Sequence, residues 1–312
     1  ITKGFTEVTD IVIKTVFMFS TQQLHELPSP TEAERLSVLA VGGYGREEMA
    51  PFSDVDLLFL TPYKVTPWAE SAIESMLYIL WDLKLRIGHA TRSITDCLLM
   101  GKKDFTIRTT LLETRLISGD ENLVSELDDR LWNELFQSST TEFVTAKLEE
   151  RLLRHKKHGE NRYLLEPNIK EGKGGLRDLQ SLFWIAKYIH HVQRPKQLIE
   201  KNVFTRFEFE KFASANDFLW KLRCHLHFIN NRGSEQLNFD SQVEIAKRLN
   251  YEDSDGRLAV EHFMQDYFKH ATYVGELTRI FLTDLEARHV KTQPNVRQIL
   301  RSAGKRLTTK LN

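Results

Sequence analysis

Hydrophobic positions along the chain follow two patterns, and the change between them falls near residue 120. Before it, the short apolar runs 36–41 and 55–60 each end at turn-forming residues and predict buried strands. Residues 68–83 place apolar side chains three or four apart, as in an amphipathic helix, and residues 86–93 predict a third short strand. A single helical turn is expected at 45–50. This part of the chain therefore predicts a small mixed sheet with helices.

Beyond residue 120, almost every segment has helical spacing. The chain is therefore expected to contain an α+β domain over residues 1–120, with a helical lead-in, followed by an all-α domain over 121–312. The helices expected in the second domain are 121–136, 140–158, 176–191, 206–230, 242–249 and 260–285.

Composition narrows the class of protein. The 312 residues are 41% hydrophobic, and 43 Lys and Arg balance 43 Asp and Glu. A protein held to nucleic acid by its overall charge is normally basic, so we expect no nucleic-acid partner. No apolar run is long enough for a membrane span, so no membrane partner is expected either. The two cysteines suit a reducing compartment, and the chain starts at Ile1 without a signal-peptide pattern. We expect a piece of a longer cytoplasmic protein.

Two aspartates point to a metal-binding site. Asp54 and Asp56 are two positions apart, so alternation along a strand predicts that their side chains share one face. Carboxylates within about 5 Å of each other repel by roughly 3 kcal/mol at an effective dielectric constant near 20. A divalent cation would offset that repulsion. Mg²⁺ is the expected ion, with Mn²⁺ as the alternative, because Mg²⁺ binds through one or two carboxylates together with substrate phosphates.

A pair of glycines supplies the other half of this site. Gly42 and Gly43 directly follow the first strand, where the absence of Cβ atoms lets the backbone approach a ligand closely. Backbone N–H groups of such a turn favour an anion such as a triphosphate. The Ser53 hydroxyl is placed to contact a phosphate oxygen. Together these elements predict metal-assisted nucleotidyl or phosphoryl transfer.

A second motif, LEPNIKEGKGGLRDLQ, occupies residues 165–180. Its glycine-rich loop leads into a helix that begins near Leu176, which again favours an anion, and Lys170 and Arg177 lie close by in sequence. The alternative is a turn that connects two domains and carries solvated charges. The basic run 151–158 is similarly expected to be a solvated helix face.

These motifs resemble a known family. Gly-Gly, a spacer of ten residues and Asp-x-Asp are typical of the polymerase-β-like nucleotidyltransferase superfamily. The string GGYGREEMAPFSDVDLLFL and the second motif are similar to one family within it, the bifunctional uridylyltransferase/uridylyl-removing enzymes of the PII nitrogen-signalling protein. The resemblance covers residues 35–285 and implies transfer of UMP from UTP to a tyrosine of PII, with release of pyrophosphate. It implies metal binding and catalysis by Asp54 and Asp56, and nucleotide binding by Gly42, Gly43, Ser53, Lys170 and Arg177.

The sequence departs from the superfamily pattern in one respect. Many members carry a third carboxylate on a later strand, but residues 86–93 contain no acid. His89 and Glu113 are candidates for the general base, and neither is assigned. The sequence also lacks the His-Asp pair of the family's hydrolase domain, so uridylyl removal is not expected here. Two alternatives stay open: an adenylyltransferase acting on another protein, such as glutamine synthetase, and a regulatory module that binds nucleotide without transferring it.

Overall fold

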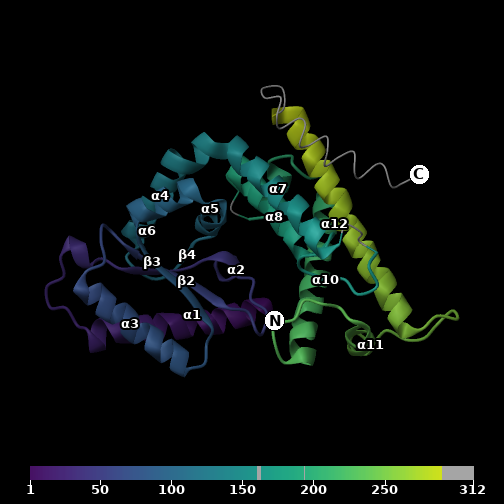
Figure 1. The fold of residues 1–312 in the computed structure, drawn as a ribbon, viewed down its shortest axis with the longest axis horizontal. Coiled ribbons are helices and arrows are strands. Elements are labelled where there is room, and N and C mark those ends of the chain that lie inside the picture. The colour runs from purple at the N-terminus through teal and green to yellow at the C-terminus, as the bar shows by residue number, and fades with distance from the viewer. Residues whose placement is uncertain (160–162, 193, 290–312) are drawn as a thin grey trace. The chain divides into compact units, whose positions relative to one another are not determined.

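The computed structural model describes residues 1–159, 163–192 and 194–289 (Figure 1). The chain forms two compact units, of which the first is Ile1–Ser139 and the second begins at Thr140. The expected fold class is confirmed, since a small mixed sheet with helices precedes a helical region. The domain boundary after residue 120 stays a prediction. The first compact unit continues beyond that point because α6 (Glu121–Leu131) packs on strands β1 and β2.

The sheet of the first unit has four strands: β1 (Ser37–Ala40), β2 (Val55–Thr61), β3 (Ile87–Ser93) and β4 (Arg115–Gly119). Their order is β3-β2-β1-β4. β1 is antiparallel to both β2 and β4, whereas β2 and β3 are parallel. A parallel pair needs a crossover, which α3 (Pro67–Asp82) provides. The sequence pattern predicts the first three strands but not β4, whose only large apolar side chains are Leu116 and Ile117.

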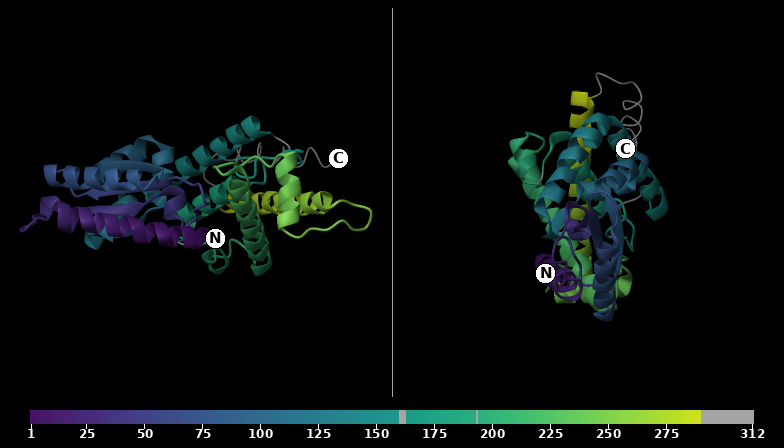
Figure 2. Two further views of the ribbon diagram at one scale, coloured as in Figure 1. Left: turned by 90° about the horizontal axis from the view of Figure 1, so that it is seen from below. Right: turned by 90° about the vertical axis from the view of Figure 1, so that its left-hand side faces the viewer.

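One face of the sheet is covered by α1 (Thr2–Phe19) and α3, which lie side by side in the left view of Figure 2. Alternate strand residues point into the core beneath these helices. Its buried side chains are Ile13, Val16, Phe17, Leu36, Val38, Ala40, Tyr44, Met49, Val55, Leu57, Phe59, Ile73, Met76, Leu77 and Leu80. Asp56, Leu58 and Leu60 alternate with these core residues along β2 and therefore face the other way. The remaining helices and turns of this unit are α2 (Gly42–Gly45), α4 (Ile94–Lys103), α5 (Phe105–Leu112), η1 (Ser20–Leu24), η2 (Glu32–Glu34), η3 (Trp132–Phe136) and η4 (Gln137–Ser139).

The described part of the second unit consists mainly of helices. They are α7 (Thr140–His158), α8 (Leu176–His190), α9 (Gln197–Glu200), α10 (Arg206–Asn230), α11 (Phe239–Arg248) and α12 (Ala259–His289). α12 packs against α8, α10 and α11, and α7 packs against α8. Leu219, Leu222 and Leu226 of α10 are fully buried, as the apolar spacing predicts. The helix expected at 242–249 instead begins at Phe239, because the Asn238 side chain caps its first turn through the Ser241 N–H.

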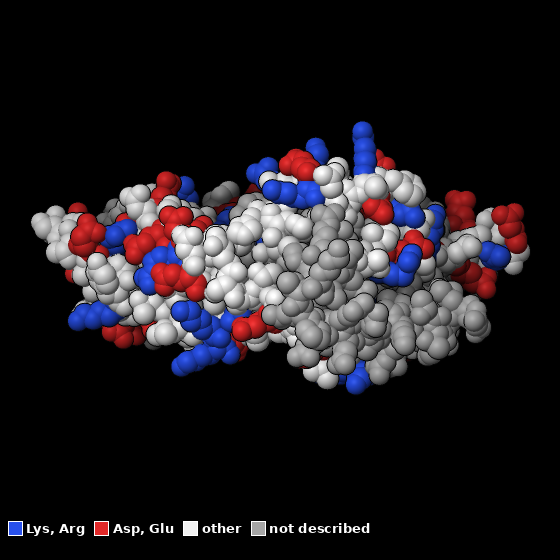
Figure 3. Space-filling view, turned by 90° about the horizontal axis from the view of Figure 1, so that it is seen from above, with Lys and Arg blue, Asp and Glu red and all other residues white. Residues whose placement is uncertain are grey.

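The surface carries both signs of charge, as the balanced composition leads one to expect, and the two cysteines are not joined in a disulfide. On the face shown in Figure 3, Lys and Arg side chains are interspersed with Asp and Glu side chains. Cys97 and Cys224 are both buried free thiols. None of the helices in the described ranges has the length and apolar character that crossing a membrane requires.

Candidate active site

The glycine turn leaves β1 and immediately forms α2. Gly42 has a φ of +59°, a left-handed conformation that favours glycine. Gly45 is also required, because a Cβ atom there would overlap the backbone carbonyl of Glu113. The helical turn expected at 45–50 was therefore wrong in position: it lies at Gly42–Gly45, since the left-handed Gly42 turns the chain into a helix at once. Sequence reasoning missed Gly45, although it belongs to the same glycine cluster.

Asp56 lies between two glycines. A Cβ on Gly88 would be 2.5 Å from Asp56 Oδ1, and a Cβ on Gly42 would be 3.4 Å from Asp56 Oδ2. The parallel register explains the first approach, because Gly88 of β3 pairs directly with Asp56 of β2. A backbone hydrogen bond also joins the glycine turn to β2, since the Val41 N–H donates to the Asp56 carbonyl over 3.1 Å. Both carboxylate oxygens of Asp56 therefore border space that only glycine leaves open.

Asp54 occupies a more exposed position. It precedes the first residue of β2, and its side chain is 64% exposed. The Arg86 Nε lies 3.6 Å from Asp54 Oδ1, and the Arg86 guanidinium also donates to the Phe52 carbonyl. The Ser53 hydroxyl accepts from the Ala50 N–H over 3.0 Å, which closes the turn before Asp54. That hydroxyl keeps its own proton for donation to another oxygen.

A pocket of about 260 Å³ opens beside Asp56. Two charged side chains line it, Asp56 and Arg92, and Gly42 and Gly88 lie at its Asp56 end. Asp54, Gly43 and Ser53 are not among the lining residues. The other lining residues are Val41, Leu57, Leu58, His89, Ala90, Thr110 and Leu111. The structure thus brings Asp56 and Gly42 together in one concave site, as the motif spacing predicts.

The donor set suits a hard cation. No group of three His, Cys, Asp or Glu side chains able to hold a metal ion occurs within the described ranges. The Asp56 carboxylate, with space at both oxygens, nevertheless suits Mg²⁺, which takes oxygen ligands and completes its coordination with water and substrate phosphates. The residues present therefore fit the expected ion.

Of the two base candidates, His89 is among the residues that line the pocket and Glu113 is not. The Glu113 side chain is 1% exposed and accepts from the Arg46 guanidinium over 2.7 Å. Burial alone would lower the pKa of Arg46, but the carboxylates of Glu48 and Glu113 raise it above its ordinary value. His89 pairs with the core residue Leu57 in the sheet register, and its ring contacts the Trp81 ring at 6.3 Å. The base stays unassigned.

The second motif has a compact structure of its own. A Cβ on Gly172 would lie 2.5 Å from the Asn168 carbonyl oxygen, and one on Gly175 would lie 2.6 Å from that of Ile169. Gly174 has a φ of +84°, and a Cβ there would be 2.7 Å from the Ala271 carbonyl of α12. The positions that glycine leaves open in this loop are thus filled by the chain's own backbone.

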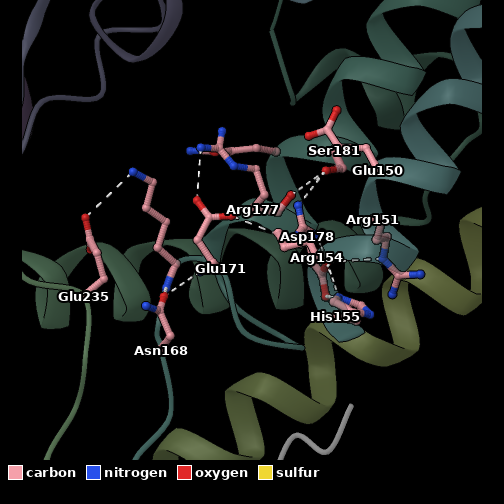
Figure 4. Close-up of polar contacts among 12 residues, drawn as sticks. Glu150, Arg151, Arg154, His155, Asn168, Glu171, Arg177, Asp178, Ser181 and Glu235 are labelled. Atoms are coloured by element: carbon pink, nitrogen blue, oxygen red, sulfur yellow. Dashed lines mark hydrogen bonds and ion pairs between the residues drawn. The ribbon is translucent and has the colours of Figure 1, made fainter. Parts of the chain in front are cut away.

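Beneath this loop, Asp178 is the centre of a buried ionic network (Figure 4). It accepts from Arg151 Nε over 3.2 Å, from His155 over 2.9 Å, from the Gly174 N–H over 2.9 Å and from Arg154. Burial would raise the pKa of Asp178, but the charge of Arg151 and the hydrogen bond from His155 hold it well below its usual range. The solvated face expected for residues 151–158 was therefore wrong for these three α7 residues, whose i, i+3, i+4 spacing directs them inward.

The two predicted nucleotide ligands of this motif are already bonded. Arg177 donates to Glu171 over 3.2 Å and to Gln180 over 2.9 Å. Lys170 Nζ lies 3.8 Å from Glu235 Oε1, and burial lowers the pKa of this lysine. Figure 4 shows Arg177 directed toward Glu171. Their role in nucleotide binding stays a prediction.

Comparisons with known proteins agree with the motifs. Residues 142–282 match a family model described as GlnD PII-uridylyltransferase. A bifunctional uridylyltransferase/uridylyl-removing enzyme of Cereibacter sphaeroides is 58% identical over 94% of this chain. Over these residues the chain is similar to this family. Enzymes of the same description from Ruegeria pomeroyi and Phenylobacterium zucineum are 57% and 52% identical over 96% and 92% of the chain. The chain spans about a third of the length of these relatives, namely 32%, 33% and 31%.

Proposed function

We propose that this chain transfers UMP from UTP to a tyrosine of the PII signal protein and releases pyrophosphate, as part of nitrogen regulation in the cytoplasm. The observation that carries the proposal is Asp56, held between Gly42 and Gly88 at one end of a pocket. The nucleotide, UTP, and the acceptor, PII, are proposed from the name of the family that the chain resembles. The same site geometry would serve other nucleotidyl transfers, so the choice of uridylyl rests on the relatives.

The residues of the turn have separate tasks in this proposal. Asp54 and Asp56 hold the metal ion, and Gly42 and Gly43 keep Cβ atoms away from the phosphates. Ser53 donates its hydroxyl proton to a phosphate oxygen. Mg²⁺ bound there, or Mn²⁺ in its place, would neutralise charge at the α-phosphate. Most of the protein's contribution is positioning and charge complementarity, as in other phosphoryl transfers.

The reaction balances without a further reactant. A bond forms between the tyrosyl oxygen and the α-phosphorus, and the bond from the α-phosphorus to the bridging oxygen breaks. The electron pair of the broken bond goes to pyrophosphate, and the phenolic proton passes to water. The products are uridylyl-tyrosine and pyrophosphate.

Lys170 and Arg177 extend the proposal to the second unit. As nucleotide ligands they would have to exchange their present bonds, because Glu235 and Glu171 already occupy them. A phosphate competes for arginine better than for lysine, since a guanidinium binds phosphate through two parallel hydrogen bonds.

The test is a labelling experiment with purified PII, glutamine synthetase, α-³²P-labelled UTP and α-³²P-labelled ATP. We expect label on PII from UTP in the presence of Mg²⁺, and none with an Asp56→Asn variant. Label from ATP alone would replace the uridylyl proposal with adenylylation. Nucleotide binding without label on either acceptor would favour a regulatory module.

A further inference from the structure

Arg92 differs from every other arginine of the first unit. Six of the seven arginines in residues 1–139, all within a described range, are bonded to carboxylates or backbone carbonyls. The pairs are Arg35 with Asp120, Arg46 with Glu48 and Glu113, Arg86 with Asp54, Arg108 with the carbonyls of Gly101 and Lys102, Arg115 with Asp10, and Arg130 with Glu134. The Arg92 side chain makes no hydrogen bond or ion pair with any described residue.

The sheet register directs Arg92 to the Asp56 side. Asp56 pairs with Gly88 and Leu60 pairs with Arg92, so Arg92 lies four positions further along the same face of the sheet. Four residues of a strand span about 13 Å. Arg92 is half-buried and lines the pocket that Asp56 lines, and the apolar residues Leu58 and Ala90 lie between their positions.

The acidic and thiol side chains close to Arg92 in sequence make no ion pair with its guanidinium. Asp96, four positions along the chain, accepts from the N–H and the hydroxyl of Ser93 and caps α4. Burial raises the pKa of the Cys97 thiol to about 12, so that thiol is uncharged near neutral pH. A half-buried cation without an ion-pair partner is unfavourable unless a ligand supplies one.

We propose that Arg92 binds the phosphates of the nucleoside triphosphate that leave as pyrophosphate. This rests on the proposed function, in which Asp54 and Asp56 act at the α-phosphate. Bond cleavage places additional negative charge on the leaving pyrophosphate, and Arg92 is the cation among the pocket-lining residues. A guanidinium matches phosphate oxygens in bidentate fashion and neither gains nor loses a proton in the step.

Isothermal titration of the 312-residue chain with UTP, UMP and inorganic pyrophosphate, each with Mg²⁺, tests the assignment. Loss of a charge-assisted hydrogen-bonded contact in Arg92→Gln is expected to raise the Kd for UTP and pyrophosphate roughly 10- to 100-fold. The Kd for UMP should stay within about twofold of wild type, because UMP lacks the leaving phosphates. Arg92→Lys keeps the charge and should recover part of the UTP affinity.

Arg130→Gln is the matched control, because it removes the same charge from an exposed pair with Glu134. Its UTP affinity should equal that of wild type, and thermal unfolding of all three variants shows whether the fold is kept. Should Arg92→Gln fail to fold, Arg92→Lys still has to weaken UTP binding more than UMP binding.

The outcomes separate the two proposals. Equal UTP and pyrophosphate affinity in wild type and Arg92→Gln, with binding lost in Asp56→Asn, overturns the assignment of Arg92 and leaves the proposed function intact. Equal weakening of UMP and UTP would place Arg92 at the nucleoside monophosphate instead and also overturns it. A wild-type chain that binds none of the three ligands contradicts both proposals. Binding with the expected Arg92 pattern but no transfer to PII contradicts only the proposed function.

Discussion

Two glycine-rich loops have similar sequence patterns, with charged residues close to clustered glycines, but their surroundings differ. In the first unit, Gly42 and Gly88 flank the Asp56 carboxylate and leave space that opens into a pocket. In the second unit, the open sides of Gly172 and Gly174 face backbone carbonyls of the same chain. The first loop is therefore built around free volume, whereas the second is built around close packing.

The charged residues beside the loops differ in the same way. Asp54 is exposed beside Arg86, and the Arg92 side chain has no bonded partner among the described residues, so a ligand can reach both groups. Asp178 is fully buried and satisfied by two arginines, a histidine and a backbone N–H. A loop of glycines and charges thus indicates close approach of some group to the backbone, but the sequence alone does not say whether that group belongs to a ligand or to the protein.

The largest effect is expected from Asp56→Asn. In the proposed function Asp56 is one of two carboxylates that hold the metal ion, and its loss removes several kcal/mol of charge stabilisation, which corresponds to a fall in transfer rate of about 10³-fold. Initial rates of labelling of PII by UTP measure this effect. An unchanged rate in both Asp56→Asn and Asp54→Asn would remove the pair from the catalytic site.

Asp178→Asn should instead reduce stability. The substitution leaves the buried Arg151 and Arg154 without a carboxylate, and breaking one side of a buried ionic network costs about 3–5 kcal/mol. Urea unfolding followed by circular dichroism measures the loss. A variant as stable as wild type would show that the network is not a structural element of the second unit.

The stability of the second unit should also depend on pH through Glu235. Burial alone would raise the pKa of Glu235, but His227 and Arg223 lower it from 4.5 to about 2. A lowered carboxyl pKa gives stability that is complete above pH 4.5 and is lost as the pH falls toward 2. The free energies of unfolding of wild type and Glu235→Gln should differ by roughly 3 kcal/mol at pH 6. That difference should shrink between pH 4.5 and 2, and a constant difference would contradict this account.

A matched pair of glycine substitutions compares the two loops directly. In Gly174→Ala, the φ of +84° and the contact with Ala271 should lower stability by about 2 kcal/mol. In Gly88→Ala, the new methyl group meets only the end of the Asp56 side chain, so Asp56 should move, with a stability change below about 1 kcal/mol. Transfer should fall at least about tenfold, since it depends on the position of this carboxylate. The comparison fails if Gly88→Ala is fully active or if Gly174→Ala is as stable as wild type.

The smallest effect is expected from Arg177→Gln. Loss of its half-buried bonds to Glu171 and Gln180 should reduce stability by about 1 kcal/mol. The predicted role in nucleotide binding requires, in addition, a higher Kd for UTP in this variant. Titration with UTP decides this point, and an unchanged Kd would leave Arg177 with a structural role only.

Sequence reasoning reached the first three strands and most of the long helices because their apolar residues repeat at periods that local structure imposes. It missed β4, which has few apolar residues and depends on pairing with β1 for its conformation. Within the site, Asp56 and Gly42 followed from spacing, since they are joined by neighbouring strands. Gly88 and Arg92 did not, because their importance depends on the parallel register between β2 and β3.

The sequence by itself determined the fold class, the resemblance to the family and the local motif of glycines and aspartates, all of which depend on residues close together in the chain. Only the tertiary structure decided which glycines border a pocket and which are packed against carbonyl groups. It also decided that Arg151, Arg154 and His155 are buried around Asp178, and that Arg92 faces the Asp56 side of the sheet. The physical reason is that burial and charge pairing are set by neighbours distant in sequence, which no local pattern specifies.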